Sequence, residues 1–169
     1  ATRSTDKGVT WSEPVVVAQV QARGTVDPES GTPIRDGANL GSLAAGRNGH
    51  LALVWQDVRF SGGQRDGIAY SRSTDGGLTW STPVQLNQAP GVQAFIPAVH
   101  IRDDGTVGVT YYDLRNNTPA ASLIADYWLV QSADGVTWRE THVAGPFDYA
   151  SAPYARGLFL GDYMGLTSV

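Results

Sequence analysis

Short stretches of alternating apolar and polar residues run through the chain, and none shows the sustained 3.6-residue periodicity of a helix. Two stretches match at a constant offset of 56 residues: "NGHLALVWQDVR" at 48–59 and "DGTVGVTYYDLR" at 104–115. Each has an Asn-Gly or Asp-Gly pair beside the alternating residues, which is typical of a β-hairpin. The pattern therefore predicts an all-β chain built from a repeated unit.

A second repeat occurs three times, as "STDKGVTW" at 4–11, "STDGGLTW" at 73–80 and "SADGVTW" at 132–138. Its Ser and Asp side chains can bond to backbone N–H groups of their own turn, and its glycine permits positive φ. The Trp can fold back as an apolar wedge between neighbouring sheets. We interpret the repeat as a structural hairpin clamp, because a catalytic site is not needed three times.

The two repeats together predict units of four strands, with the clamp between the third and fourth strand. The expected strands are 40–45, 51–56, 67–73 and 82–86, then 96–101, 107–112, 125–131 and 140–144. The chain divides into the end of one unit with a connecting loop (1–39), two complete units (40–94 and 95–157) and the start of another (158–169).

The string Ser-x-Asp-x-Gly-x-Thr-Trp resembles the Asp-box of bacterial neuraminidase repeats, and the resemblance covers essentially the whole chain. It implies a sialidase-like β-propeller of four-stranded antiparallel blades, present here as a partial or half propeller. Sialidase propellers have six blades, so either the chain is a segment of a longer one or two copies pair as a homodimer that completes the ring. Asp-boxes also occur in receptors, lectin-like proteins and assembly factors without hydrolase activity, so they specify the fold better than the activity.

Composition excludes several classes of function. The net charge is −4 and lysine occurs once, without any run of basic residues, which argues against a nucleic-acid partner. No stretch of eighteen apolar residues predicts a membrane span. Cysteine is absent and the three histidines lack ligand spacing, so we expect no cofactor, although the acidic stretches "DPES" and "RDG" leave calcium open. The first residues do not form a signal peptide, which is either absent or already removed.

The long connections between blades would lie on the face opposite the boxes, where binding residues are expected. The resemblance implies a secreted or surface exo-glycosidase that hydrolyses terminal sialic acid or a related acidic glycan, with a Tyr nucleophile and an Asp acid/base. Arginines would grip the substrate carboxylate. The catalytic candidates are Asp162, Tyr163 and Asp113, and the substrate-binding candidates are Arg115, Arg59, Arg156 and Arg35.

Two features keep other functions open. The Asp-x-Arg pairs at Asp57 and Asp113 recur at the same blade position, which also suits a structural role in satisfying turn amides. Sialidases resemble one another in an Arg-Ile-Pro string, but this chain has "AFIPAV", with Phe95 in place of the arginine. The alternatives are a non-catalytic propeller that binds glycan or protein, with Phe95, Tyr149 or Tyr154 stacking on sugars, and a scaffold for a site completed elsewhere.

Overall fold

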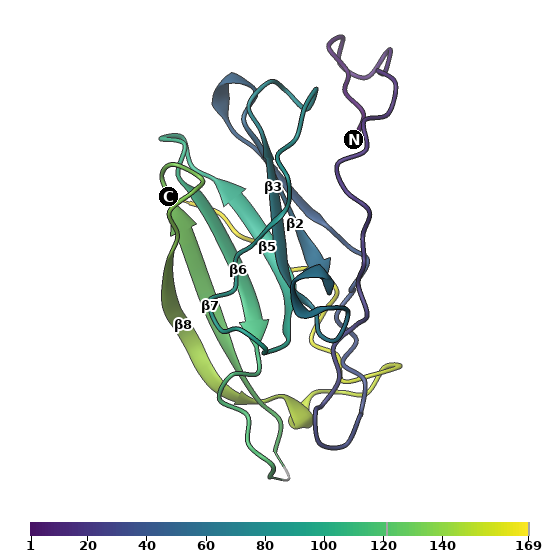
Figure 1. The fold of residues 1–169 in the computed structure, drawn as a ribbon, viewed down its shortest axis with the longest axis vertical. Helices are drawn as coiled ribbons and strands as arrows, with labels where there is room; N and C mark the ends of the chain where they lie inside the picture. Colours follow the sequence, from purple (N-terminus) through teal and green to yellow (C-terminus); the bar gives the residue numbers. More distant parts are fainter. Residues whose placement is uncertain (121, 169) are drawn as a thin grey trace.

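The computed structural model describes residues 1–120 and 122–168, which form two four-stranded antiparallel sheets (Figure 1). The first sheet contains β1 (Ser42–Ala45), β2 (Leu51–Asp57), β3 (Gly67–Ser73) and β4 (Val84–Gln85). The second contains β5 (Ala94–Ile101), β6 (Val107–Asp113), β7 (Ile124–Ser132) and β8 (Arg139–Asp148). The described residues also form three short 3₁₀ helices: η1 (Arg47–Gly49) between β1 and β2, η2 (Arg59–Ser61) between β2 and β3, and η3 (Tyr149–Ser151) after β8.

The predicted strands are confirmed, with differences at their ends. Strand β4 is limited to two residues, because Pro83 just before it has no N–H to donate to the ladder. Strand β8 is longer than expected and continues past Ala144 to Asp148 through shifts in its register with β7. In both sheets, strands that are neighbours in the chain are also neighbours in space, so each sheet is a simple meander.

The main core lies between the two sheets. The first sheet contributes the inward side chains of Val54, Ile68 and Tyr70, and β5 and β6 cover them. Trp138 packs edge-on against Tyr70, with the ring centroids 4.9 Å apart. Burying side chains of this size supplies about 1.5–3 kcal/mol each, so this interface holds the two blades together. A second cluster around Phe95 lies near the long connections.

The clamp predicted for the repeated string is present. In the second copy, Ser73 Oγ accepts the N–H of Gly77 at 2.9 Å and donates to Asp75 at 2.8 Å. Asp75 also accepts the N–H of Thr79 at 3.0 Å. These bonds are all local to the turn, and hydrogen bonds from Thr79 hold the pKa of Asp75 well below its usual range. The carboxylate therefore closes a hairpin, which agrees with a structural interpretation of the box.

The meander places the turns of each sheet at two opposite ends. The β1–β2 and β3–β4 turns, with the boxes, lie at the upper end in Figure 1, and the connections that follow β2, β6 and β8 lie at the lower end. The segment 21–26 crosses the lower end and is fixed there, because its backbone N–H groups bond to the side chains of Asp57 at the end of β2, Asp66 just before β3 and Gln93 just before β5. The candidate residues are therefore positioned on one side of a rigid scaffold.

Candidate functional site

Arg35 and Asp162 form one ion pair across 127 positions of sequence. The guanidinium Nε and Nη2 donate to the two carboxylate oxygens at 3.2 and 2.8 Å, so the pair is bidentate. A parallel bridge between Ile34 and Leu158 brings the two segments side by side, and Arg35 N donates to Leu158 O at 2.9 Å. The guanidinium also lies over the ring of Phe159 at 4.2 Å, and it remains partly open to solvent.

Tyr163 and Arg156 lie on the same segment as Asp162, and both are exposed. Tyr163 has 78% of its surface accessible. A small hairpin, closed by Ala155 N donating to Gly157 O at 2.8 Å, carries Arg156 at its tip with φ near 63°. The segment from 154 to 163 therefore presents two exposed phenols, a carboxylate and the guanidinium of Arg156, and Arg35 adds a second guanidinium.

Asp57 and Arg59 form a second pair at the end of β2. Asp57 is fully buried and accepts Arg59 Nη2 at 2.6 Å, Arg59 N at 2.9 Å and the indole N–H of Trp55 at 2.7 Å. Burial alone would raise the pKa of Asp57, but these hydrogen bonds outweigh it and lower the pKa. Arg59 also donates to the carbonyl of Gln19 at 2.6 Å. The arginine is therefore already engaged by the protein.

Asp113 and Arg115 form the third pair, at the end of β6. Arg115 Nε donates to Asp113 at 2.7 Å, and its two Nη groups donate to Glu140 at 2.6 and 2.9 Å. The guanidinium lies 3.6 Å from the ring of Trp128, whose N–H donates to Asp113 at 3.0 Å. Glu140 also accepts the hydroxyl of Tyr111. Burial raises the pKa of Asp113 despite these donors.

Five of the seven candidates therefore lie in three ion pairs, and in the described part of the chain no hydrogen bond or ion pair joins one pair to another. The pair that includes Asp162 has Tyr163 and Arg156 nearby in sequence and keeps exposed surface. Asp113, Arg115 and Arg59 direct their polar groups at protein partners. An arginine can bind a substrate carboxylate only if it can release the protein carboxylate that it now holds. Arg35 is the most exposed of the three paired arginines, so it is best placed to do this.

Phe95 is buried and takes part in an aromatic cluster. Its ring stacks on Tyr112 at 5.7 Å between centroids and meets Tyr149 edge-on at 5.5 Å. Ile96 follows with φ near 51°, an uncommon value for a β-branched residue, and its N–H is held by Gln56 at 3.1 Å. The local backbone thus turns Phe95 into the core, so this position offers no side chain to a ligand.

Several functional or supporting groups gave no signal in the sequence. Asp66 is buried without a cation and accepts the N–H groups of Arg23 and Gly24 at 3.0 and 2.6 Å, and burial raises its pKa. Asp36 does the same for Thr25 at 2.7 Å. These partners are far apart in the chain, apart from Asp36 and Thr25, so local patterns could not pair them. Their role is to fasten the segment that crosses the loop end of the scaffold.

Neither a metal site nor a membrane helix is found among the described residues. Across 1–120 and 122–168, no three His, Cys, Asp or Glu side chains gather in a way that could hold a metal ion. In the acidic stretch considered for calcium, Asp27 bonds to the hydroxyl of Ser30 and the N–H of Glu29. Over the same residues, no helix is both long and apolar enough to cross a bilayer.

Comparison with protein families matches the chain to a BNR repeat-like domain over residues 1–155. The chain belongs to this family. The two meander sheets of this BNR repeat-like chain are consecutive blades of a partial, sialidase-like β-propeller. Among solved structures it is similar to "Hadza microbial sialidase Hz136", with 22% identity and a TM-score of 0.47. That match covers 63% of this chain and 26% of the other, and no curated protein matches.

Proposed function

We propose that this chain carries part of the active site of a secreted or surface exo-glycosidase, which hydrolyses terminal sialic acid or a related acidic glycan. The observation that carries the proposal is the partly exposed bidentate pair of Arg35 and Asp162, with the exposed Tyr163 next to Asp162 in the sequence. A substrate carboxylate has the same shape and charge as the Asp162 carboxylate. It can therefore replace Asp162 on the guanidinium, which releases Asp162 for proton transfer.

In this proposal each group has one role. Arg35 binds the substrate carboxylate, with Arg156 as a second holder on the hairpin tip. Tyr163 is the nucleophile: its phenol oxygen bonds to the anomeric carbon as the glycosidic C–O bond breaks. The freed Asp162 carboxylate accepts the phenol proton and passes it to the departing oxygen, and a water molecule then releases the sugar from Tyr163 by the reverse proton transfers. Asp113, Arg115 and Arg59 are less suited to these roles, because displacing them from their buried partners leaves uncompensated charges.

The test is hydrolysis of a fluorogenic sialic-acid glycoside by the purified chain. Tyr163→Phe and Asp162→Asn should each lower turnover by about 10²-fold or more, because each removes a group that acts in the transition state. Arg35→Lys should mainly raise KM, since a lysine cannot form the bidentate bond. Tyr154→Phe is the matched control, because Tyr154 is also an exposed phenol on this segment. Equal loss in Tyr154→Phe, or turnover retained in Tyr163→Phe, contradicts the assignment.

The second candidate is glycan binding without catalysis. It is favoured by three aromatic residues on one segment: Phe159, which lies under Arg35, and the exposed Tyr154 and Tyr163, since exposed aromatic rings can stack on sugars. Binding of a sialoside by the folded chain, without turnover and with loss of binding in Arg35→Met, would support this candidate. It would also exclude the catalytic assignment.

A further inference from the structure

A cavity of about 180 Å³ lies between the two sheets, at the end of the scaffold that carries the boxes. Buried residues of both sheets line its inner part, Tyr70 from the first and Ile101 and Val107 from the second. Exposed residues line its rim, among them His50 and Asp104, so the cavity opens to solvent there. It has room for several water molecules or for one small ligand.

The hydroxyl of Tyr70 is the feature of this cavity that indicates a ligand. Only 2% of the Tyr70 surface is exposed, and its hydroxyl forms no hydrogen bond with any residue of 1–120 or 122–168. Tyr149 also has an unpartnered hydroxyl, but that oxygen is enclosed by the protein, whereas Tyr70 lines a cavity. Burial raises the pKa of Tyr70, and the charge of Arg72 offsets this only in part, so the phenol is protonated. A buried donor without a partner is unfavourable, so a ligand that accepts from it gains affinity.

Arg72 supplies a second donor to the cavity and is held in place by the third box. Its Nη1 donates to the carbonyl of Asp134 at 2.5 Å, and Gly135 leaves room for the guanidinium, because a Cβ there would overlap with it. A guanidinium has five N–H donors, so others remain for a ligand. The Asp134 carboxylate is already engaged, since it accepts the hydroxyl of Ser132 and two N–H groups of its own turn.

Asp104 supplies an acceptor at the rim. Its carboxylate accepts the N–H of Thr106 at 2.9 Å, which lowers its pKa, and its contact with Arg102 is long, at 3.9 Å. The cavity therefore offers one cation, Arg72, and one available anion, so a ligand with a net charge of either sign is repelled by one of them. A hydroxyl group suits both, because it accepts from Arg72 or Tyr70 and donates to Asp104. The apolar side chains of the inner part can contact the C–H groups of a sugar ring.

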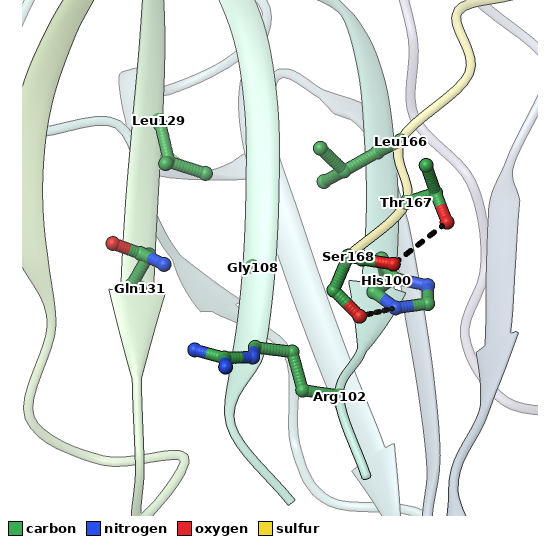
Figure 2. Close-up of a pocket in the computed structure, with 8 residues that line it drawn as sticks. All are labelled: His100, Arg102, Gly108, Leu129, Gln131, Leu166, Thr167 and Ser168. Atoms are coloured by element: carbon green, nitrogen blue, oxygen red, sulfur yellow. Dashed lines mark hydrogen bonds between the residues drawn. The ribbon is translucent and has the colours of Figure 1, made fainter. Parts of the chain in front are cut away.

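The second sheet has a cavity at the equivalent place, but its lining differs (Figure 2). It measures about 340 Å³ and lies on the outer face of the sheet. The offset of 56 residues between β2 and β6 places Leu129 where the first sheet has Tyr70, and Gln131 where it has Arg72. The polar residues that line this second cavity are all exposed or half-buried. The repeated unit therefore does not require a buried phenol and a guanidinium at these positions, which favours a role specific to the cavity between the sheets.

We propose that the cavity between the two blades binds one neutral sugar unit at the box end of the scaffold. Tyr70 and Arg72 donate hydrogen bonds to its hydroxyl groups, and Asp104 accepts one from them. The two donors are fixed before the ligand arrives, because Tyr70 is packed against Trp138 and Arg72 is bonded to the third box. The site lies at the opposite end of the scaffold from Arg35 and Asp162, so it does not depend on the proposed catalysis.

An NMR titration of the ¹⁵N-labelled chain with glucose, galactose and N-acetylglucosamine tests this proposal. At least one sugar should shift the amide signals of cavity residues in a saturable way. Tyr70→Phe should raise the dissociation constant about tenfold, because it removes the donor but keeps the ring that packs on Trp138. Tyr127→Phe is the matched control, since Tyr127 is a half-buried tyrosine outside the lining. Absence of saturable shifts with all three sugars, shifts confined to 154–163, or equal weakening by Tyr127→Phe overturns the proposal.

A second pair of variants tests the acceptor without touching the core. Asp104→Asn should raise the dissociation constant of the sugar about fivefold, because a charged acceptor is replaced by a neutral one. Asp103→Asn is its control, since the neighbouring Asp103 is exposed and does not line the cavity. Sodium acetate and tetramethylammonium chloride probe for an anionic or a cationic ligand in the same titration. Tighter binding of either ion than of the sugars, or equal effects of the two variants, contradicts a site for a neutral sugar.

Discussion

The two Asp-x-Arg motifs occupy the same place in their sheets but obtain their third partner differently. Asp57 receives an indole N–H from Trp55 on its own strand, whereas Asp113 receives one from Trp128 on the neighbouring strand. Ala69 stands opposite Trp55 in the first ladder. The comparison teaches that a buried carboxylate requires donors around it, and that either strand of the pair can supply the indole.

The arginine of the second motif also forms more ion pairs than that of the first. Arg115 serves both Asp113 and Glu140, while Arg59 serves one carboxylate and a carbonyl. The pKa of Asp57 is lowered by its donors, and the pKa of Asp113 is raised by burial. Burial thus opposes the ionised form of Asp113, which makes its cation more necessary. Because Arg115 serves two carboxylates, its loss should cost more stability than the loss of Arg59, and its guanidinium should be less available to a ligand.

Arg115→Met should have the largest effect. It leaves Asp113 and Glu140 buried or half-buried without their shared cation, so the free energy of unfolding should fall by about 3–5 kcal/mol. Urea unfolding at pH 7 measures it. Arg47→Met is the control, because its pair with Asp103 is exposed and should matter by at most about 0.5 kcal/mol. Equal effects of the two variants would refute the ranking.

Arg59→Met should come second, at about 2–3 kcal/mol in the same measurement. Only Asp57 loses its cation, and it keeps the N–H donors of Trp55 and of residue 59 itself. If Arg59→Met lowered the free energy of unfolding more than Arg115→Met, the number of carboxylates that each arginine binds would not determine the loss of stability.

Glu140→Gln should lower the free energy of unfolding by about 1–2 kcal/mol at pH 7, because it removes the charge of the second carboxylate that Arg115 binds. Arg59 binds only one carboxylate, so this contribution is specific to the second motif. Burial opposes ionisation of Glu140, but bonds from Arg115 and Tyr111 lower its pKa below the ordinary 4.5. Its contribution is therefore complete above the unfolded pKa and is lost as pH falls through the folded pKa. Urea unfolding below about pH 4.5 should show the gap between wild type and Glu140→Gln closing. A gap that stays constant down to about pH 3 would rule out this linkage.

The smallest expected effect is the difference in stability between variants of the two tryptophans. Trp55→Phe and Trp128→Phe each remove one N–H donor to a buried carboxylate, and Trp55 is the more deeply buried. Trp55→Phe should be the more destabilising by about 0.5–1 kcal/mol, measured as above. The reverse order would indicate that the contact of Trp128 with Arg115 outweighs burial.

Much of the fold could be predicted from the sequence because its determinants are local. Alternation around Asn-Gly and Asp-Gly pairs predicted the strands, and the spacing of the three boxes predicted the repeat. The contacts that define the candidate site are not local. Arg35 and Asp162 were each named as candidates, but nothing in either segment indicates that they bind one another. The ion pair of Arg115 with Glu140 likewise depends on how β6, β7 and β8 pack together, because the two residues lie at β6 and β8.

The outer edges of the two sheets have a consequence for how the chain behaves at high concentration. Strand β4 presents only two residues, and β8 carries Pro146, the charged side chains of Arg139 and Glu140, and two shifts in register with β7. Such edges are poor templates for adding another strand, so fibrillar growth along the hydrogen-bond direction is blocked. We therefore expect any contact between copies at high concentration to use side-chain surfaces rather than strand addition.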